Sequence, residues 1–235
     1  RTLEIVIAGR PDRIAVYGYA HLPEVFKAQR QIDPADMPPA STRLALLGLA
    51  IDTLRQAGYQ YLGMDHFALP QDELVVAQEN GTLQRNFQGY STRGYCDLIG
   101  LGVSSIGKVG DNFVQNLKTL PEYYGALDRG ELPVHRGLTL TRDDIIRRDV
   151  IQQIMCYGVL DFDATARRFG IDFRSYFASE LVTLQPMVAD GLAEFADPGL
   201  RVLPAGRLLL RHLGMAFDAY LPTAQASQQR FSKAI

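Results

Sequence analysis

Cysteine is scarce in this sequence and tryptophan is absent. The chain of 235 residues contains two cysteines, Cys96 and Cys156, and no tryptophan. Two thiols so far apart in the sequence match neither a zinc nor an iron–sulfur spacing, so we expect no metal site in this chain. A single disulfide between them is an alternative. Because nothing else indicates secretion, we expect reduced thiols and a cytoplasmic protein.

Long apolar runs and an excess of one charge are also missing. No run approaches the roughly 20 apolar residues of a membrane-spanning helix, so we expect no membrane segment. The 24 Lys and Arg residues nearly balance the 26 Asp and Glu residues, for a net charge of −2. Such a balance argues against attraction to nucleic acid or to an anionic membrane.

The start of the chain lacks both an initiator methionine and a signal sequence. Residues 3–7 are mostly apolar and lead into Gly9-Arg10-Pro11, which is typical of the end of a helix. A natural start rarely falls inside an amphipathic element. We therefore expect this sequence to be a piece of a longer protein.

The first half alternates helical patterns with short apolar runs, which is typical of an α/β fold. The patterns predict helices at 23–30, 41–57 and 72–79 and strands at 13–19, 59–64 and 97–106. This order favours α/β units on a mostly parallel sheet. Three strands cannot close a barrel, so we expect one side of a larger barrel.

Helical patterns dominate after Asp111. They predict helices at 119–130, 141–157, 163–169, 173–189 and 205–220, an extended connector at 133–140, and a hairpin of 192–195 with 200–203. Three helices, a hairpin and a helix resemble a winged-helix layout. Such a layout suggests DNA binding, but the near-neutral charge argues against it.

Polar and aromatic residues follow two of the predicted strands, where ligands gather in α/β sheets. After the first strand, Ala20 allows close approach of a ligand, and His21, with Tyr19 beside it, can donate a hydrogen bond or move a proton. The alternative is that these residues only pack and cap the loop. Asp65 and His66 follow the second strand and would point to opposite faces of it, so we interpret them as orienting a ligand or the next helix rather than binding a metal. The alternative is that Asp65 caps the next helix and His66 is satisfied within the fold.

A third polar loop contains Phe87, which offers a stacking face, and Gln88, which offers a donor and an acceptor. It suits a flat ligand, although a surface turn is an equal alternative. The glycine-rich run 100–107 has neither a phosphate-loop Lys-Ser pair nor a dinucleotide fingerprint, and we interpret it as a tight strand that a cofactor can approach.

Two groups of arginines stand out in the second half. Arg142, Arg147 and Arg148 share a helix with several aspartates, so we expect a solvated, self-paired face. Arg207 and Arg211 are four positions apart on the last predicted helix and can hold a carboxylate.

Several blocks in a fixed order together resemble the oxygen-independent coproporphyrinogen III oxidases, which belong to the radical S-adenosylmethionine (SAM) enzymes. The blocks are Tyr19-Ala20-His21-Leu22-Pro23, Gly63-Met64-Asp65-His66-Phe67-Ala68, Asp72-Glu73-Leu74, Arg85-Asn86-Phe87-Gln88-Gly89-Tyr90, Gly102-Val103-Ser104, Leu140-Thr141-Arg142-Asp143-Asp144 and Arg147-Arg148-Asp149-Val150-Ile151. The resemblance implies oxidative decarboxylation of coproporphyrinogen III to protoporphyrinogen IX in haem synthesis.

The resemblance also implies SAM and a 4Fe–4S cluster held by a C-x-x-x-C-x-x-C motif, which this chain lacks. It implies SAM contacts at Ala20 and Ile106, and at Phe87 and Gln88 for a second SAM near the substrate. Tyr19 and His21, and likewise Asp65 and His66, follow as possible lining of the site. We expect no catalytic residue in this chain, no cofactor bound by it alone, and an inactive fragment.

The implied division is the C-terminal part of a radical-SAM barrel at 1–125, a connector at 126–136, and a helical domain at 137–235 that covers the site. An exposed barrel edge would favour self-association. The alternative is a haem chaperone of the same superfamily, but its usual His-Asn-x-x-Tyr-Trp segment is missing.

Overall fold

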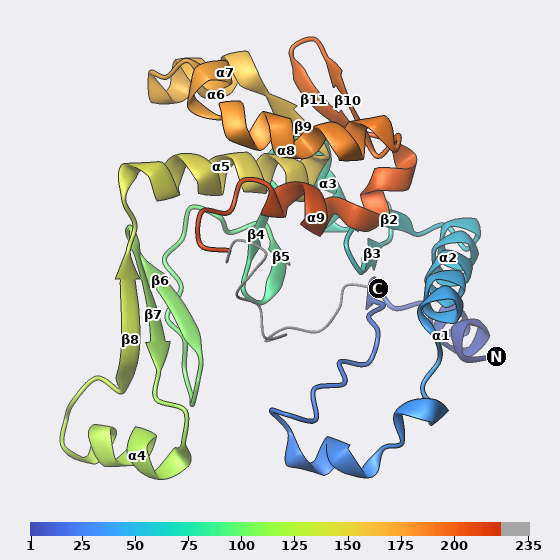
Figure 1. The fold of residues 1–235 in the computed structure, drawn as a ribbon. Coiled ribbons are helices and arrows are strands. Elements are labelled where there is room, and N and C mark those ends of the chain that lie inside the picture. Colours follow the sequence, from blue (N-terminus) through green and yellow to red (C-terminus); the bar gives the residue numbers. More distant parts are fainter. Residues whose placement is uncertain (222–235) are drawn as a thin grey trace. The chain divides into compact units, whose positions relative to one another are not determined.

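The computed structural model describes residues 1–221, which fall into two compact units. The first unit is Arg1–Asn80, with which Tyr220 is grouped, and the second is Gly81–Ala219 (Figure 1). The predicted division at 125/126 and 136/137 concerns a larger barrel and stays a prediction. The last residues of the predicted 137–235 domain, 222–235, lie outside the described part of the chain.

The first unit combines helices with a small antiparallel sheet. Its elements are α1 (Thr2–Gly9), β1 (Arg13–Ala15), the 3-10 helices η1 (Lys27–Gln31) and η2 (Pro34–Asp36), α2 (Ala40–Gln56), β2 (Gln60–Gly63), β3 (His66–Ala68) and α3 (Glu73–Glu79). The sheet has the order β1-β3-β2.

The core of the first unit lies between the small sheet and the buried faces of α2 and α3, both of which contact β2. Leu54 on α2, Leu62 on β2, Phe67 on β3 and Val75 on α3 are almost completely buried. Asp72 caps α3 by accepting a hydrogen bond from the Leu74 backbone N–H at 2.8 Å.

The second unit contains three more antiparallel sheets and a group of helices. Its elements are β4 (Gln84–Asn86), β5 (Gly89–Ser91), β6 (Ile106–Val109), β7 (Asn112–Asn116), α4 (Leu120–Asp128), β8 (Val134–Thr139), α5 (Arg142–Tyr157), β9 (Val159–Asp161), α6 (Phe162–Phe169), α7 (Phe173–Tyr176), α8 (Ala178–Ala189), β10 (Ala193–Ala196), β11 (Gly199–Val202), η3 (Pro204–Leu209) and α9 (Leu210–Met215). The sheets have the orders β4-β5, β6-β7-β8 and β10-β11-β9. In Figure 1, α4 closes one end of the β6-β7-β8 sheet, and α5 runs beside α9.

Helix α5 is the central element of the second unit. Thr141 and Asp144 form the reciprocal capping box that the sequence predicts, and Gly158 ends the helix in the left-handed conformation at φ +67°. Ile146, Val150 and Ile154 are fully buried along one stripe of the helix. This stripe fixes which residues face the opposite side, toward the candidate site described below.

The predicted hairpin near the C-terminus is confirmed. Strand β10 pairs with β11 in antiparallel register from Ala193↔Val202 to Ala196↔Gly199, and β9 adds a third strand. Aromatic rings join this sheet to the neighbouring helices: the Phe162 ring at the start of α6 lies 6.4 Å from that of Phe195 on β10 and stacks on that of Phe173 on α7 at 4.2 Å between centroids. These ring contacts pack the β9–β10–β11 sheet against α6 and α7.

The mix of helices and sheets agrees with the predicted α/β class, but the prediction of a mostly parallel sheet is wrong. Every strand pairing found in residues 1–221 is antiparallel. The sequence order of helices and strands does not reveal that β3 folds straight back on β2. Met64, with φ +57°, makes this tight turn possible.

Several predicted boundaries need correction. The buried strand predicted at 97–106 is mostly loop, because Gly102 and Ser104 adopt positive φ and Leu101 is 83% exposed. The strand predicted at 13–19 ends at Ala15, and the helix predicted at 23–30 is the short 3-10 helix η1. The helix at 173–189 breaks at Phe177, and the one at 205–220 becomes η3 and α9.

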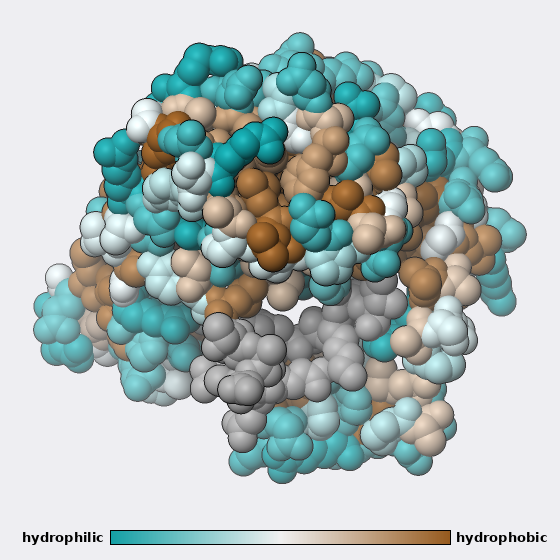
Figure 2. Space-filling view, turned by 45° about the horizontal axis from the view of Figure 1, so that its top comes forward, coloured by the Kyte–Doolittle hydropathy of each residue, from teal (hydrophilic) through white to brown (hydrophobic). Residues whose placement is uncertain are grey.

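No helix within residues 1–221 combines the length and the apolarity that crossing a membrane requires. Exposed hydrophobic residues are interspersed among hydrophilic ones on the face shown in Figure 2. The exposed hydrophobic residues of the chain include Ile5 on α1 and Leu46 and Leu49 on α2, each of which is more than half exposed.

Candidate functional site: an arginine-lined pocket in the second unit

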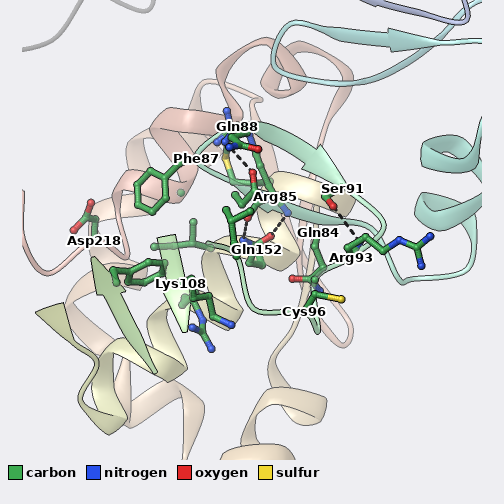
Figure 3. Close-up of a pocket in the computed structure, with 18 of the residues that line it drawn as sticks. Gln84, Arg85, Phe87, Gln88, Ser91, Arg93, Cys96, Lys108, Gln152 and Asp218 are labelled. Atoms are coloured by element: carbon green, nitrogen blue, oxygen red, sulfur yellow. Dashed lines mark hydrogen bonds between the residues drawn. The ribbon is translucent and has the colours of Figure 1, made fainter. Parts of the chain in front are cut away.

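A pocket of about 710 Å³ lies entirely within the second unit, between two helices and two hairpins. The β4–β5 hairpin and the segment 93–98 form one wall, β6 and β7 contribute Lys108 and Phe113, and α5 and the α9 segment form the rest (Figure 3). The pocket therefore collects residues from across the unit, and no single stretch of sequence forms it.

Two helical segments each present one regular face to the pocket. The residues are Arg148, Ile151, Gln152 and Met155 from α5, and Arg211, Gly214, Met215 and Asp218 from α9 and the turn after it. Both sets follow the i, i+3, i+4, i+7 spacing of one helix face. A Cβ on Gly214 would lie 3.5 Å from Met155 Sδ, an ordinary van der Waals contact, so α9 packs directly against α5 at this position.

The β4–β5 hairpin is fastened to α5 by side chains rather than by a sheet. The Arg85 backbone N–H donates to Gln152 Oε1 at 2.9 Å, and Gln152 Nε2 donates back to the Arg85 carbonyl. Tyr90 Oη donates to the Met155 carbonyl at 2.8 Å, and Tyr157 Oη to the Leu83 carbonyl at 2.6 Å. These contacts hold the tip of the hairpin at the pocket.

The tip of the hairpin carries the aromatic face of the pocket. Phe87 is 63% exposed and meets Phe113 edge to face, with 5.5 Å between ring centroids. The Gln88 backbone N–H donates to Asn86 Oδ1 at 2.8 Å, which fixes the turn and leaves the Gln88 side chain at the pocket. Figure 3 shows Phe87 and Gln88 at this tip. A flat ligand could therefore stack on Phe87 while it contacts Gln88.

The lining is strongly cationic. Five cationic side chains line the pocket against two carboxylates: Arg85, Arg93, Lys108, Arg148 and Arg211 against Asp97 and Asp218. Asp97 Oδ1 already accepts the Gly110 backbone N–H at 2.8 Å. Such a surplus of positive charge in a partly enclosed space favours an anionic ligand.

Two of these arginines have buried donors without a partner. Arg85 Nε and Arg148 Nη1 are buried and make no hydrogen bond within the described residues. Buried charged donors are normally paired, because desolvation without a hydrogen bond is costly. The unpaired donors indicate that the acceptor that completes this site does not come from residues 1–221.

The two cysteines do not form a cluster site. Cys96 is exposed at the pocket, whereas Cys156 is buried and donates to Gln152 Oε1 at 3.3 Å. Burial raises the pKa of the Cys156 thiol to about 12, so this sulfur stays protonated and is a poor metal ligand. No group of three or more His, Cys, Asp and Glu side chains in residues 1–221 is placed to hold a metal ion. The residues present thus do not fit a 4Fe–4S cluster.

Three predicted site residues lie in a loop of the first unit. Gln29 holds this loop, since its Nε2 donates to the Ala20 carbonyl at 3.0 Å and its carbonyl lies 3.2 Å from His21 Nε2. Tyr19 stacks on His21 with ring centroids 6.2 Å apart. Packing within the loop, the alternative to ligand binding, is therefore present for His21, and a ligand role for these residues stays a prediction.

Asp65 and His66 are brought together, although adjacent strand residues would point apart. The turn between β2 and β3 places Asp65 Oδ1 2.7 Å from His66 Nδ1. The helix that follows is capped by Asp72 instead, so Asp65 does not serve as its cap. The pair can orient the imidazole, and its contact with a ligand stays a prediction.

The structure gathers only some of the predicted SAM contacts. Phe87 and Gln88 line the pocket, whereas Ile106 lies on β6 and does not line it. Ala20 belongs to the first unit. The joint role of these four residues at SAM is therefore still a prediction.

The predictions for the arginines had mixed outcomes. Arg147 is self-paired as predicted, with Asp143 at 2.7 Å and Glu180 at 2.8 Å. The self-paired interpretation is wrong for Arg148, which lines the pocket with an unpartnered donor. Arg211 lines the pocket and Arg207 does not, so the predicted pair of the two does not form there. Gln152 was missed, although its position four residues after Arg148 interrupts the apolar pattern of the helix.

The chain is similar to part of a solved radical SAM enzyme. A solved structure described as coproporphyrinogen III oxidase (HemN) from Escherichia coli, a radical SAM enzyme, matches with a TM-score of 0.89 and 48% identity, covering 94% of this chain and 51% of that one. The chain thus shares the fold of part of a radical SAM enzyme. The family described as the HemN C-terminal domain matches residues 140–209.

Curated relatives identify the family. Oxygen-independent coproporphyrinogen III oxidase from Thermostichus vulcanus is 46% identical over 226 residues, covering 96% of this chain and 69% of the relative. The protein of the same name from Pseudomonas aeruginosa is 50% identical over 235 residues, covering 100% of this chain and 51% of the relative. The chain belongs to the oxygen-independent coproporphyrinogen III oxidase family. It spans about half the length of most of the curated relatives it matches, and their names favour the oxidase over the haem chaperone.

Proposed function

We propose that this chain forms the tetrapyrrole-holding part of an oxygen-independent coproporphyrinogen III oxidase, which acts in the cytoplasm. Relatives over the whole chain carry that name. The observation that supports this role most strongly is the pocket of the second unit, with five cationic side chains and an aromatic face at Phe87. Coproporphyrinogen III is a large ring with four propionate groups, so a cationic, partly apolar pocket matches its chemistry.

The apolar lining supplies the other half of the match. Leu98, Phe113, Ile151 and Met155 contribute hydrocarbon surface between the charged groups. Pockets for organic ligands typically combine such a surface with a few placed polar groups. The ring would rest on this surface while its propionates reach the cationic side chains.

We do not propose that this chain carries out radical SAM chemistry by itself. A 4Fe–4S cluster together with SAM would supply the radical chemistry in a SAM enzyme of this class. The two cysteines of this sequence are too few for a three-thiolate cluster, and Cys156 is buried and protonated. We therefore propose that the chain alone is inactive. After anaerobic reconstitution with iron and sulfide it should produce no 5′-deoxyadenosine from SAM, and production would contradict this.

We propose that Phe87 and Gln88 contact SAM near the substrate, and that Ala20 and Ile106 contact a SAM elsewhere. Tyr19, His21, Asp65 and His66 are proposed as further lining. Because the chain covers about half the length of its relatives, and the other half of the site wall is therefore missing, we expect the chain alone to bind SAM weakly or not at all. Isothermal calorimetry tests this, and a micromolar Kd would be the contradictory result.

The tetrapyrrole role is tested by titrating the 235-residue chain with coproporphyrin III, the stable oxidised form of the substrate. Quenching of porphyrin fluorescence should saturate at one equivalent with a micromolar Kd. Mesoporphyrin IX, a ring with two propionates, should bind more weakly because it has fewer carboxylates. Absence of saturable binding by coproporphyrin III would contradict the proposed role.

Self-association is also part of the proposal. In the first unit, Leu46 and Leu49 on α2 are 53% and 58% exposed, and Ile5 on α1 is 65% exposed. Apolar side chains grouped on neighbouring helices favour contact with another chain. Light scattering should show a mass that rises with concentration and falls back toward the monomer in a Leu46→Glu, Leu49→Glu variant. A strict monomer at high concentration would contradict this.

A further inference from the structure

Two buried guanidinium donors in the same pocket have no hydrogen-bond partner among the described residues. Arg85 Nε and Arg148 Nη1 are both buried and unpaired within the described residues, and both residues line the pocket. A guanidinium cannot lose its proton to escape desolvation, unlike a lysine or a histidine. An acceptor from a ligand is the simplest way to satisfy both donors.

The two arginines come from two elements that contact each other, β4 and α5. Arg148 precedes Gln152 by one helical turn on the pocket face of α5, and Gln152 holds the Arg85 backbone by two hydrogen bonds. Each guanidinium therefore extends from an element that is held in place without a ligand: Arg148 from helix α5, and Arg85 from strand β4, which Gln152 bonds to α5. A preorganised pair loses less side-chain freedom when it binds an anion.

The environment of Arg85 keeps its donor edge available. Its guanidinium lies over the Tyr90 ring, with Cζ 5.8 Å from the ring centroid. A ring beneath the guanidinium face interacts with the π system and leaves the in-plane N–H groups free for an acceptor. Tyr90 itself is anchored through its hydroxyl to the Met155 carbonyl, so this support is rigid.

The shape of the guanidinium selects the chemical class of the ligand group. Planar N–H forks match the two oxygens of a carboxylate. Arg211 and Lys108 add positive charge in the same pocket, whereas Asp97 is engaged with the Gly110 backbone. A carboxylate on a flat apolar body suits both these cations and the Phe87 face.

We propose that Arg85 and Arg148 form a carboxylate clamp that holds one propionate of the tetrapyrrole and so fixes how the ring sits in the pocket. That the bound carboxylate is a propionate of the substrate rests on the proposed function. The amino-acid carboxylate of SAM has the same chemistry and is the competing source. The clamp itself, as a carboxylate site, rests only on the two unpaired donors and their shared pocket.

The clamp is tested first without a tetrapyrrole. In a ¹⁵N–¹H spectrum of the arginine side chains, sodium propionate should shift the Arg85 Nε–H signal and slow its exchange with water, whereas sodium chloride at equal ionic strength should not. An Arg85 signal that ignores propionate and coproporphyrin III alike would overturn the clamp.

The source is tested by affinity. Arg85→Gln and Arg148→Gln should each weaken coproporphyrin III binding at least tenfold, and Arg148→Lys should weaken it less because the charge remains. Arg129→Gln, which removes an exposed arginine outside the pocket, should leave the affinity unchanged. Circular dichroism on each variant confirms that it is folded.

Each result separates the clamp from the proposed function. If the wild-type chain binds coproporphyrin III and the clamp variants bind it equally well, the clamp is wrong and the tetrapyrrole role stands. If propionate shifts the Arg85 signal but coproporphyrin III does not bind, the clamp stands and the tetrapyrrole role fails. If SAM shifts that signal and coproporphyrin III does not, the carboxylate belongs to SAM and the propionate assignment is overturned.

Discussion

Gln152 and Arg85 exchange two hydrogen bonds across 67 positions of sequence. The side-chain amide of Gln152 offers one donor and one acceptor to the Arg85 backbone, so a helix residue takes the place of a neighbouring strand. The β4–β5 hairpin therefore has its position set by α5. This exchange acts together with the Tyr90 and Tyr157 hydroxyls, which donate to the Met155 and Leu83 carbonyls, to position the aromatic tip at Phe87 and the guanidinium of Arg85.

Gln152→Met should weaken both the fold and the pocket. The variant keeps the length of the side chain but leaves two Arg85 backbone groups without their partner, which costs about 1–3 kcal/mol in unfolding free energy. It should also weaken coproporphyrin III binding about tenfold, since the hairpin loses its anchor. Urea denaturation and fluorescence titration measure the two effects.

Gln153→Met is the matched control for that variant. Gln153 bonds Asp149 at 2.8 Å and Thr165 at 3.1 Å and does not line the pocket. It should lose a similar amount of stability and keep its affinity. Equal losses of affinity in both variants would show that the effect comes from general destabilisation.

Phe87→Ala should separate binding from stability. Because Phe87 is 63% exposed, its removal should change the unfolding free energy by less than about 1 kcal/mol. The loss of a stacking face should weaken coproporphyrin III binding about fivefold or more. Tyr124→Ala, at a 56% exposed ring on α4, should change neither quantity appreciably. Unchanged binding in Phe87→Ala would remove the aromatic tip from the site.

The two thiols should react very differently. Cys96 is exposed at the pocket, whereas burial raises the pKa of Cys156 to about 12. At pH 8 a disulfide reagent should modify one thiol per native chain and two after unfolding in guanidinium chloride. Saturating coproporphyrin III should slow the reaction of Cys96. Two rapidly reacting thiols in the native chain would contradict the burial of Cys156.

Arg147→Met should destabilise the second unit in a pH-dependent way. Arg147 donates to Asp143, Glu180 and the Phe217 carbonyl, and its loss should cost about 2 kcal/mol at pH 7. Burial alone would raise the pKa of Asp143 and Glu180, but hydrogen bonds outweigh it and lower both. The stability from these depressed pKa values is present above the ordinary values of 3.8 and 4.5 and is lost as the pH falls through the folded-state values.

The difference in stability between the wild type and Arg147→Met should therefore shrink as the pH falls from 7 toward 3. Urea denaturation at several pH values measures it. Arg129→Met is the control, because its pair with Glu131 is exposed and surface pairs contribute little. A difference that stays constant with pH would contradict the role assigned to the two carboxylates.

The sequence predicted the elements whose signals are local. The helices predicted at 72–79 and 141–157 and the hairpin around Pro198 all depend on residues within a few positions of one another, and the structure contains all three. The strand at 97–106 failed because its apolar residues, such as Leu101, occupy turns that glycine makes possible.

The pocket could be predicted only in part. Phe87, Gln88 and Arg211 were recognisable because aromatic, amide and guanidinium groups suit ligands wherever they occur. The roles of Gln152 and Arg148 were not, since they depend on contacts with the hairpin and on the packing of α9 against α5. Helical spacing puts Arg148 and Gln152 on one face, but it does not say that this face lines a pocket.

The most direct test of the account is hydrogen–deuterium exchange on the 235-residue chain with and without coproporphyrin III. The account predicts slower exchange in three separate stretches that meet at the pocket, 84–98, 148–155 and 211–218. Slower exchange confined to other parts of the chain, or no change at a saturating porphyrin concentration, would contradict it.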